Sequence, residues 1–227
     1  MNFKKTAICA ASMLMLTFVS GCGAEQVEQV PNAVVGENAF IITLYPDVAP
    51  ITCKNFQSLV KDGFYNGLTF HRVMDDFMAQ GGDPSGNGTG GSEKMIKGEF
   101  KSNGVNNTLS HQRGVVSMAR SQDPNSASSQ FFICYVDKCA EWLDGDYAAF
   151  GEVTEGMEVV DSFLKVERTM SMTGEMSVPT SPIIMDKVWM IEKDGEGHPR
   201  VEVMMQPIPV SEEQPEEEAA EADGSAE

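Results

Sequence analysis

The stretch FHRVMDDFMAQGGD, from Phe70 to Asp83, combines one guanidinium, two apolar side chains and one amide just before a glycine turn. In an extended strand, successive side chains point to opposite faces, and the acidic pair in the middle of the stretch indicates a turn that re-aims the residues after it. Arg72 and Gln80 can then share a wall with Phe77 and Met78. Taken singly, an arginine is usually solvated and Phe or Met usually belongs to a core, so the combination carries the interpretation.

The sequence on both sides of this stretch predicts a mainly β protein. Short β-rich runs alternate with loops rich in Gly, Asn, Ser and Asp, and only two segments, Pro50–Lys61 and Glu155–Leu164, have apolar residues at helical spacing. Such a pattern favours an antiparallel sheet or closed barrel over βαβ repeats. The expected strands are Phe40–Tyr45, Leu68–Val73, Phe77–Gln80, Gly114–Met118, Gln130–Val136, Ala148–Val153 and Lys187–Ile191, with a short run at Val201–Met204 that extends or covers an edge.

The run GNGTGG, from Gly86 to Gly91, matches the glycine spacing of dinucleotide-binding sites. Such sites need a helix directly after the glycines and an acidic residue about twenty positions further on. The next segment of the chain shows no convincing helix, and Asn106 and Asn107 stand where the acid is required. We therefore interpret the run as a surface loop that needs positive φ angles, and we expect no nucleotide or other cofactor.

A second informative region comprises VSMARSQDPNSASSQFFICYV, Val116 to Val136, and EWLDGDYAAFG, Glu141 to Gly151. Together with FHRVMDDFMAQGGD and NGTGG, these motifs resemble the cyclophilin family of peptidyl-prolyl cis-trans isomerases, over roughly Ala39 to Ile191. The resemblance implies a closed eight-stranded antiparallel β-barrel capped by two α-helices. It also implies catalysis of rotation about X-Pro bonds, proline-containing polypeptides as partners, and binding of cyclosporin-type inhibitors.

The same motifs imply a site. Arg72 matches the family's catalytic arginine, and Gln80 matches the amide that steadies the arginine and the substrate. The implied substrate-binding positions are Phe77, Met78 and Phe132 as floor and exposed walls of the proline pocket, Gln130, Trp142, Leu143 and Tyr147 as further groove positions, Ala119, Arg120 and Ser121 as partners of the substrate backbone, and Gly88 on the far side.

Two departures from the family pattern keep a rival hypothesis open. Arg120 stands where many members have Asn, with one extra residue before Pro124, and Tyr147 stands where the best-known members have His. An aromatic ring at Tyr147 can still stack on proline. The alternative to an isomerase is a proline-peptide binding or chaperone-like module with little turnover, which would keep the groove but not the catalysis.

The N-terminus predicts an export signal over residues 1–21, in which two lysines precede an apolar run from Ala7 to Val19 that is short for a membrane span. The sequence VSGC at its end resembles the bacterial lipobox, which implies acylation of Cys22. An ordinary secretory signal with a chance cysteine is the alternative. We expect a flexible tether over 22–36 and an exported protein anchored, through Cys22 alone, to the outer face of the bacterial cell membrane.

The chain is acidic, with a formal net charge of −18, which argues against a nucleic-acid surface. Eight of the acidic residues lie between Glu212 and Glu227 without a compensating base, so we expect a disordered acidic tail over 206–227. The tail lacks the spaced ligands and turn glycine of a calcium loop. The length left for 37–205 suits one isomerase domain, expected to be a monomer.

Three cysteines belong to the predicted domain. An odd number predicts no complete disulfide framework. Cys134 and Cys139 can pair if a hairpin joins them, whereas Cys53 and Cys134 are better interpreted as small buried apolar residues. No histidine stands at metal-ligand spacing to a cysteine, so we expect no zinc site and no other metal.

Overall fold

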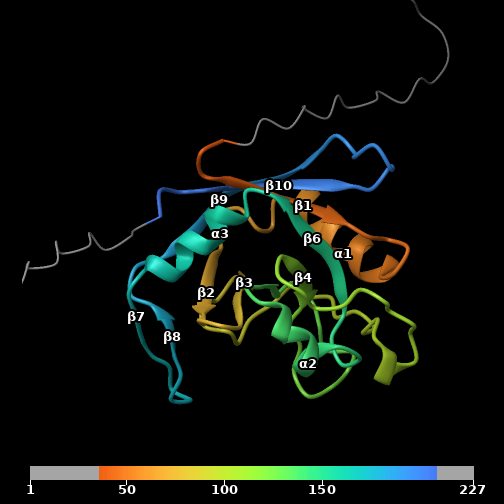
Figure 1. Ribbon diagram of the computed structural model, residues 1–227, viewed down its shortest axis with the longest axis horizontal. Coiled ribbons are helices and arrows are strands. Elements are labelled where there is room, and N and C mark those ends of the chain that lie inside the picture. The colour runs from red at the N-terminus through yellow and green to blue at the C-terminus, as the bar shows by residue number, and fades with distance from the viewer. Residues whose placement is uncertain (1–35, 209–227) are drawn as a thin grey trace, which may run out of the picture.

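The computed structural model describes residues 36–208. Eight antiparallel strands close into a barrel in the order β1-β10-β9-β2-β3-β5-β4-β6. This confirms the mainly β fold class and the closed eight-stranded barrel. Most of these strands are labelled in Figure 1. The barrel strands are β1 (Ala39–Leu44), β2 (Thr69–Val73), β3 (Met78–Asp83), β4 (Val115–Met118), β5 (Phe131–Cys134), β6 (Ala149–Glu155), β9 (Ile183–Ile191) and β10 (Arg200–Met205).

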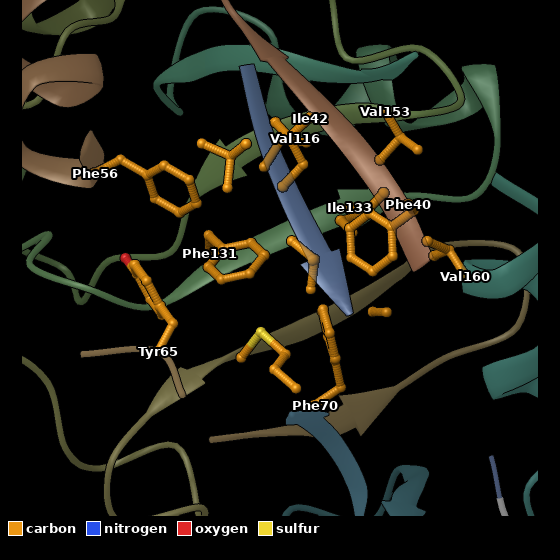
Figure 2. Packing of buried hydrophobic residues seen from close by; sticks show 14 of the residues in the cluster. Phe40, Ile42, Phe56, Tyr65, Phe70, Val116, Phe131, Ile133, Val153 and Val160 are labelled. Atoms are coloured by element: carbon orange, nitrogen blue, oxygen red, sulfur yellow. The ribbon is translucent and has the colours of Figure 1, made fainter. Parts of the chain in front are cut away.

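Alternation along the strands separates two apolar clusters. On β5, Phe131 and Ile133 point into the barrel, whereas Phe132 and Cys134 belong to a smaller cluster on its outer wall. Figure 2 shows the interior rings and branched side chains meeting at the centre of the barrel, with Phe131 among them. The outer cluster makes one patch of the barrel wall apolar on both faces, and the site lies there.

Helix α1 (Pro50–Lys61) begins with a proline and lacks a capping side chain of its own. The buried carboxylate of Glu99 replaces that cap, accepting from the backbone N–H groups of Ile51 and Thr52 at 3.0 and 2.7 Å and from the Thr52 hydroxyl at 2.7 Å. A negative charge there also suits the positive end of the helix dipole. The helix inserts Phe56 into the barrel core.

Helix α3 (Met157–Ser162) and the 3₁₀ turn η3 (Phe163–Lys165) lie on the opposite side of the barrel from α1 in Figure 1. Val160 and Phe163 join the same core. The two expected helices are therefore present. A third, α2 (Ala140–Leu143), comes after the turn η2 (Asp137–Cys139) and was not predicted, because four residues are too short to show a period. One further 3₁₀ turn is η1 (Lys101–Asn103).

Two strand assignments differ from the sequence-based expectation. Strand β10 does not extend or cover an edge, because it pairs with both β1 and β9 and closes the barrel. A small hairpin of β7 (Arg168–Met170) and β8 (Met176–Pro179), which the sequence did not predict, precedes β9 and projects beside β2 in Figure 1. Its strands are three and four residues long and rich in methionine, so they carry little β signal.

Several predictions concern residues beyond the described range. The signal over 1–21, Cys22, nearly all of the 22–36 tether, and the acidic tail from residue 209 onward lie outside it. Among residues 36–208, no helix has the length and apolar character needed to cross a membrane.

Candidate active site

Arg72, Gln80 and Phe132 lie in one row across the barrel wall. Arg72 is paired with Gln80 between β2 and β3, and Gln80 with Phe132 between β3 and β5. Directly opposed residues of neighbouring strands place their side chains on the same face. The guanidinium, the amide and an aromatic ring thus share one outer surface, as the stretch from Phe70 to Asp83 predicted for the first two.

The Arg72 guanidinium is held from two sides. Its Nη1 donates to Gln80 Oε1 at 3.3 Å, and its Nε and Nη2 donate to the two carboxylate oxygens of Glu175 at 3.0 and 2.9 Å. Its Cζ lies 5.9 Å from the centre of the Phe77 ring. A guanidinium carries five N–H groups, so one on Nη1 and one on Nη2 remain for a bound molecule.

A chain of amides connects Arg72 to the glycine-rich turn, residues 86–91. Gln80 Nε2 donates to Gln130 Oε1 at 2.8 Å, and Gln130 Nε2 donates to the carbonyls of Gly88 and Gly90 at 3.1 and 2.7 Å. Each amide uses its oxygen on one neighbour and its nitrogen on the next. The orientation of Gln80 is thereby fixed, and with it the acceptor that faces Arg72.

The glycine-rich turn is organised by the buried carboxylate of Asp83. Burial alone would raise the pKa of this group, but hydrogen bonds from the turn prevail and lower it below 3.8. These bonds come from the backbone N–H groups of Ser85, Asn87, Gly88 and Gly90. Since the backbone donors are directed at an internal acid, the geometry supports a structural loop rather than a pyrophosphate cradle.

Beside Arg72, whose guanidinium lies over the Phe77 ring, is an apolar cluster. Met78, Phe132 and Leu143 are its buried members, and the half-buried Phe77 and Tyr147 pack against them. Met78 is only 1% exposed, so the expectation of an exposed pocket wall is wrong for this residue, because its strand position directs it into the outer cluster beneath the surface.

Aromatic contacts extend the pocket rim. Trp142 is 50% exposed and meets the Phe77 ring edge-on at 5.8 Å, while the Tyr147 and Phe132 rings meet edge-on at 5.9 Å. Edge-to-face pairs fix ring orientation and leave ring faces free to stack. Partly exposed aromatic rings of fixed orientation therefore border the apolar cluster.

A hydrogen-bonded group of Asp144, His111 and Ser117 packs against the Phe132 ring. His111 stacks on the Phe132 ring at 6.1 Å, and its ring nitrogens contact Asp144 Oδ1 at 2.7 Å and Ser117 Oγ at 2.9 Å. Ser117 is fully buried, so this acid–histidine–serine arrangement presents no nucleophile to a substrate. Burial lowers the pKa of His111 although Asp144 opposes that shift, which keeps the ring neutral near pH 7.

The segment Ala119–Ser121 borders a cavity of about 360 Å³ that continues past Gln80 and Gly88. The Ala119 N–H donates to the Gln130 carbonyl, and the Ser121 N–H donates to Ser126 Oγ, both at 2.9 Å. Two of the three backbone N–H groups of this segment are thus used within the protein. The Arg120 guanidinium packs 4.7 Å from the centre of the Tyr147 ring.

Cys53, Cys134 and Cys139 are buried free thiols. Cys134 is hydrogen-bonded to Cys139, whose sulfur also donates to the Phe77 carbonyl at 3.2 Å. The interpretation of Cys53 and Cys134 as buried apolar residues is confirmed, and the alternative of a Cys134–Cys139 disulfide is not realised. Within residues 36–208, His, Cys, Asp and Glu side chains form no cluster of three or more suited to a metal ion.

The sequence missed Glu175, Asp144 and His111. Glu175 lies 103 residues from Arg72 on a hairpin without a clear strand pattern, so no spacing rule connects them. Asp144 lies inside the motif WLDG, and His111 precedes the strand that carries Ser117. The sequence does not indicate that His111 contacts Asp144 and Ser117, because that contact depends on how the strands and α2 pack together.

The barrel wall thus combines a fixed arginine, an amide and an apolar aromatic cluster, with a cavity beside Gln80. The family model described as cyclophilin type peptidyl-prolyl cis-trans isomerase/CLD matches residues 33–189. The chain belongs to this family, and its activity is peptidyl-prolyl cis-trans isomerisation.

Named relatives agree. A protein of Helicobacter pylori called peptidyl-prolyl cis-trans isomerase is 44% identical over 142 residues, covering 60% of this chain and 83% of that one. One from Acinetobacter baylyi with the same name is 44% identical over 145 residues, covering 63% and 74%. The crystal structure of a cyclophilin type isomerase of Cryptosporidium parvum with the dipeptide Ala-Pro is similar at a TM-score of 0.55 and 28% identity, covering 73% and 92%.

Proposed function

We propose that this isomerase acts on X-Pro bonds of exported proteins from a lipid-anchored position, with Arg72 as the catalytic donor and Gln80 as the residue that positions it. The observation that carries the catalytic part is the fixed guanidinium, with one N–H left on each terminal nitrogen, beside an apolar pocket. Phe77, Phe132, Leu143 and Tyr147 supply surface for a proline ring.

The chemistry is set by the peptide bond. Rotation about X-Pro loses amide resonance, with a barrier of about 18–20 kcal/mol. In the twisted state the proline nitrogen regains a lone pair, so a donor that bonds it only then lowers the barrier without stabilising the planar states equally. Arg72 is permanently charged and is held by Gln80 and Glu175. About 7 kcal/mol of such differential stabilisation corresponds to roughly five orders of magnitude in rate.

The groove runs from Gln80 past Gly88 toward Ala119–Ser121. We assign to it the residues that flank proline, with Gln130 in its lining. Trp142, which packs on Phe77, stands beside the proline ring instead. The Arg120 N–H and the carbonyls of Ala119 and Arg120 are the polar groups for the substrate backbone, because the Ser121 carbonyl accepts from Arg120 Nη1 at 2.9 Å. The Tyr147 and Arg120 side chains, packed together, replace the family's more usual residues at one end of the pocket.

Exchange NMR on a proline peptide separates the isomerase from the rival binding module. We expect cross-peaks between cis and trans forms to build up far faster with the purified protein than in buffer. Peptide shifts that show binding, together with an exchange rate equal to that in buffer, would support the module with little turnover instead.

The proposed lipid anchor at Cys22 and the proposed export of the protein are supported by the sequence alone. A small-residue site before Cys22 and the basic, apolar segment preceding it support export and acylation. Proline isomerisation is slow enough to limit folding, and a cofactor-free catalyst suits a compartment without ATP. Mass spectrometry of the mature N-terminus from the native host tests this: we expect a lipid-modified Cys22, whereas an unmodified or retained N-terminus contradicts the anchor.

A further inference from the structure

The β7–β8 hairpin contacts the proposed catalytic arginine directly, through Glu175. It contributes no residue to the apolar cluster that we assign to the proline ring. Its turn, Ser171–Glu175, closes through a hydrogen bond from the Ser171 N–H to the Glu175 carbonyl at 2.7 Å. Arg168 at its base forms an ion pair with Asp75 at 2.9 Å, and Glu175 binds Arg72. Two ion pairs, one to strand β2 and one to the turn that follows it, thus fix the hairpin beside the site.

A cavity of about 620 Å³, here called the hairpin cavity, lies between this hairpin and the glycine-rich turn. Its lining includes Arg72, Gln80 and Gly88, which also belong to the proposed substrate site. The hairpin cavity is therefore continuous with that site on the side of Arg72 occupied by Glu175, away from Ala119–Ser121. A peptide whose proline sits beside Arg72 finds room on this side for one of its neighbouring residues.

The outer wall of the hairpin cavity is apolar. Met170 is 54% exposed and Met172 is fully exposed, and Val178 also lines the cavity from the same hairpin. Methionine is flexible and polarizable, and exposed methionines are typical of surfaces that accept varied apolar side chains. Exposed apolar residues gathered at one cavity, rather than scattered singly, indicate a binding surface.

The floor of the hairpin cavity carries polar groups without partners. Among the described residues, both ring nitrogens of His71 and the Ser177 hydroxyl are buried and make no hydrogen bond. A Cβ atom built on Gly88 would stand 3.6 Å from His71 Nε2, so the glycine-rich turn forms a thin cover over the ring. Unpaired buried polar groups are rare, and here three such atoms lie just beneath the surface that lines the hairpin cavity.

The charge of the cavity favours an uncharged occupant. Both oxygens of Glu175 already accept from Arg72, so the local charges are balanced. An acidic side chain would face the Glu175 carboxylate and compete for Arg72, and a basic one would compete with Arg72 for Glu175. An acidic or a basic side chain of the bound peptide would therefore disrupt the bidentate Arg72–Glu175 pair, whereas an aliphatic side chain would leave that pair intact.

We propose that the hairpin cavity is a second substrate subsite, which takes an aliphatic or methionine side chain within a few residues of the isomerised proline. Met170 and Met172 determine its specificity, and Glu175 couples its occupancy to the position of Arg72. The subsite rests on the proposed function of Arg72, since it adjoins the same guanidinium. It gives this isomerase a preference for apolar stretches around proline, which unfolded chains expose.

The test compares two peptide series, with X as Leu, Ser or Glu placed two residues before or two residues after proline. We expect kcat/KM from exchange NMR to favour Leu over Ser by about five-fold in one series, with Glu lowest. The double variant Met170→Ser/Met172→Ser reduces that preference to below about two-fold, with rates on the Ser peptides unchanged. Met204→Ser, which changes an exposed methionine on β10, is the matched control.

A second readout does not depend on turnover. In protein with labelled methionine methyl groups, the Leu peptide of the favoured series shifts the Met170 and Met172 signals, and the Ser peptide shifts them less. An unchanged Leu-to-Ser ratio in the double variant, or methyl signals that do not respond to any peptide, overturns the subsite. Absence of catalysis on every peptide while the methyl signals still respond overturns the proposed function but not the subsite.

Discussion

At the scale of single residues, Arg72 combines rigidity with remaining donors. Three of its N–H groups bind Glu175 and Gln80, and these partners come from a distant hairpin and a neighbouring strand. A long, flexible side chain loses conformational freedom when it is fixed, and here that loss occurs on folding instead of in the transition state. The catalytic role that we propose for Arg72 therefore includes this clamp.

Glu175→Gln tests the clamp. The variant keeps the shape of the side chain but loses the charge and one of the two acceptor oxygens. We expect kcat to fall by about 3–10-fold with little change in KM, because a partly exposed bidentate pair stabilises its geometry by only about 1 kcal/mol. The measurement is exchange NMR over a range of peptide concentrations.

The matched control is Glu167→Gln, an exposed glutamate just before the same hairpin, and it should leave both constants unchanged. A Glu175→Gln protein that turns over as fast as the unsubstituted one would show that Arg72 needs only Gln80 to hold it.

His111 makes stability depend on pH. Burial lowers its pKa in the folded protein, so the unfolded chain binds more protons below the ordinary value of about 6.5. The free energy of unfolding is then highest above pH 6.5 and falls as the pH drops below it toward the folded-state pKa. Burial also lowers the pKa of His71, which adds a loss of the same sign.

Urea unfolding at several pH values between 7 and 5 checks this. The stability of the unsubstituted protein should decline across the interval, and His111→Gln should show a shallower decline, since one of the two histidines no longer titrates. Equal slopes for the two proteins would contradict the assignment of a buried neutral ring to His111.

At the scale of elements, helix α1 depends on a residue outside itself. Glu99 is buried and accepts three hydrogen bonds at the helix start, from two backbone N–H groups and the Thr52 hydroxyl. Charge-assisted bonds to buried donors are the stronger kind, and their loss leaves those donors unpaired. The loop that carries Glu99 and the helix that closes the barrel are thus stabilised together.

Glu99→Ala should lower the free energy of unfolding by about 2–4 kcal/mol, through the lost cap and the unsatisfied donors. Urea denaturation followed by circular dichroism measures the change. Glu158→Gln, in the first turn of α3, is the control for an acidic residue at a helix start without buried partners, and we expect a change below about 0.5 kcal/mol. Similar effects of the two substitutions would argue against the capping role.

The elements also show which parts of the fold a sequence can predict. Helix α1 shows helical spacing of its apolar residues because one face packs against the core, and strands such as β1 and β5 are apolar runs buried along their whole length. The β7–β8 hairpin is held by ion pairs to Arg72 and Asp75 instead, and such long-range pairs leave no periodic pattern. The same reasoning explains why Arg72 and Gln80 were identified and Glu175 was not.

At the scale of the whole molecule, the site residues lie on one wall of one barrel. Every residue assigned to catalysis or binding is within residues 36–208, whereas Cys22 and the acidic tail lie outside that range. The motifs resembling cyclophilins supplied the fold and the positions of the pocket. The motifs do not show how deeply each side chain is buried. In the structure, Met78 lies within the outer apolar cluster and is not an exposed wall of the site.

A chain shortened to residues 36–208 should therefore keep the kcat/KM of the chain that lacks only the signal. The comparison uses the same proline peptide and exchange NMR. A loss of more than about three-fold on shortening would show that the tether or the acidic tail contributes to catalysis, contrary to a site contained in one domain.

The most direct test of the role of Arg72 is the exchange rate of a proline peptide with Arg72→Ala and Arg72→Lys. We predict that both variants bind the peptide but lose at least about 100-fold in kcat/KM, because alanine removes the donor and lysine cannot satisfy Glu175, Gln80 and the twisted nitrogen together. Arg113→Lys, which changes a surface ion pair with Asp161, should remain fully active. Full activity of Arg72→Ala would contradict the assignment of Arg72 as the catalytic donor.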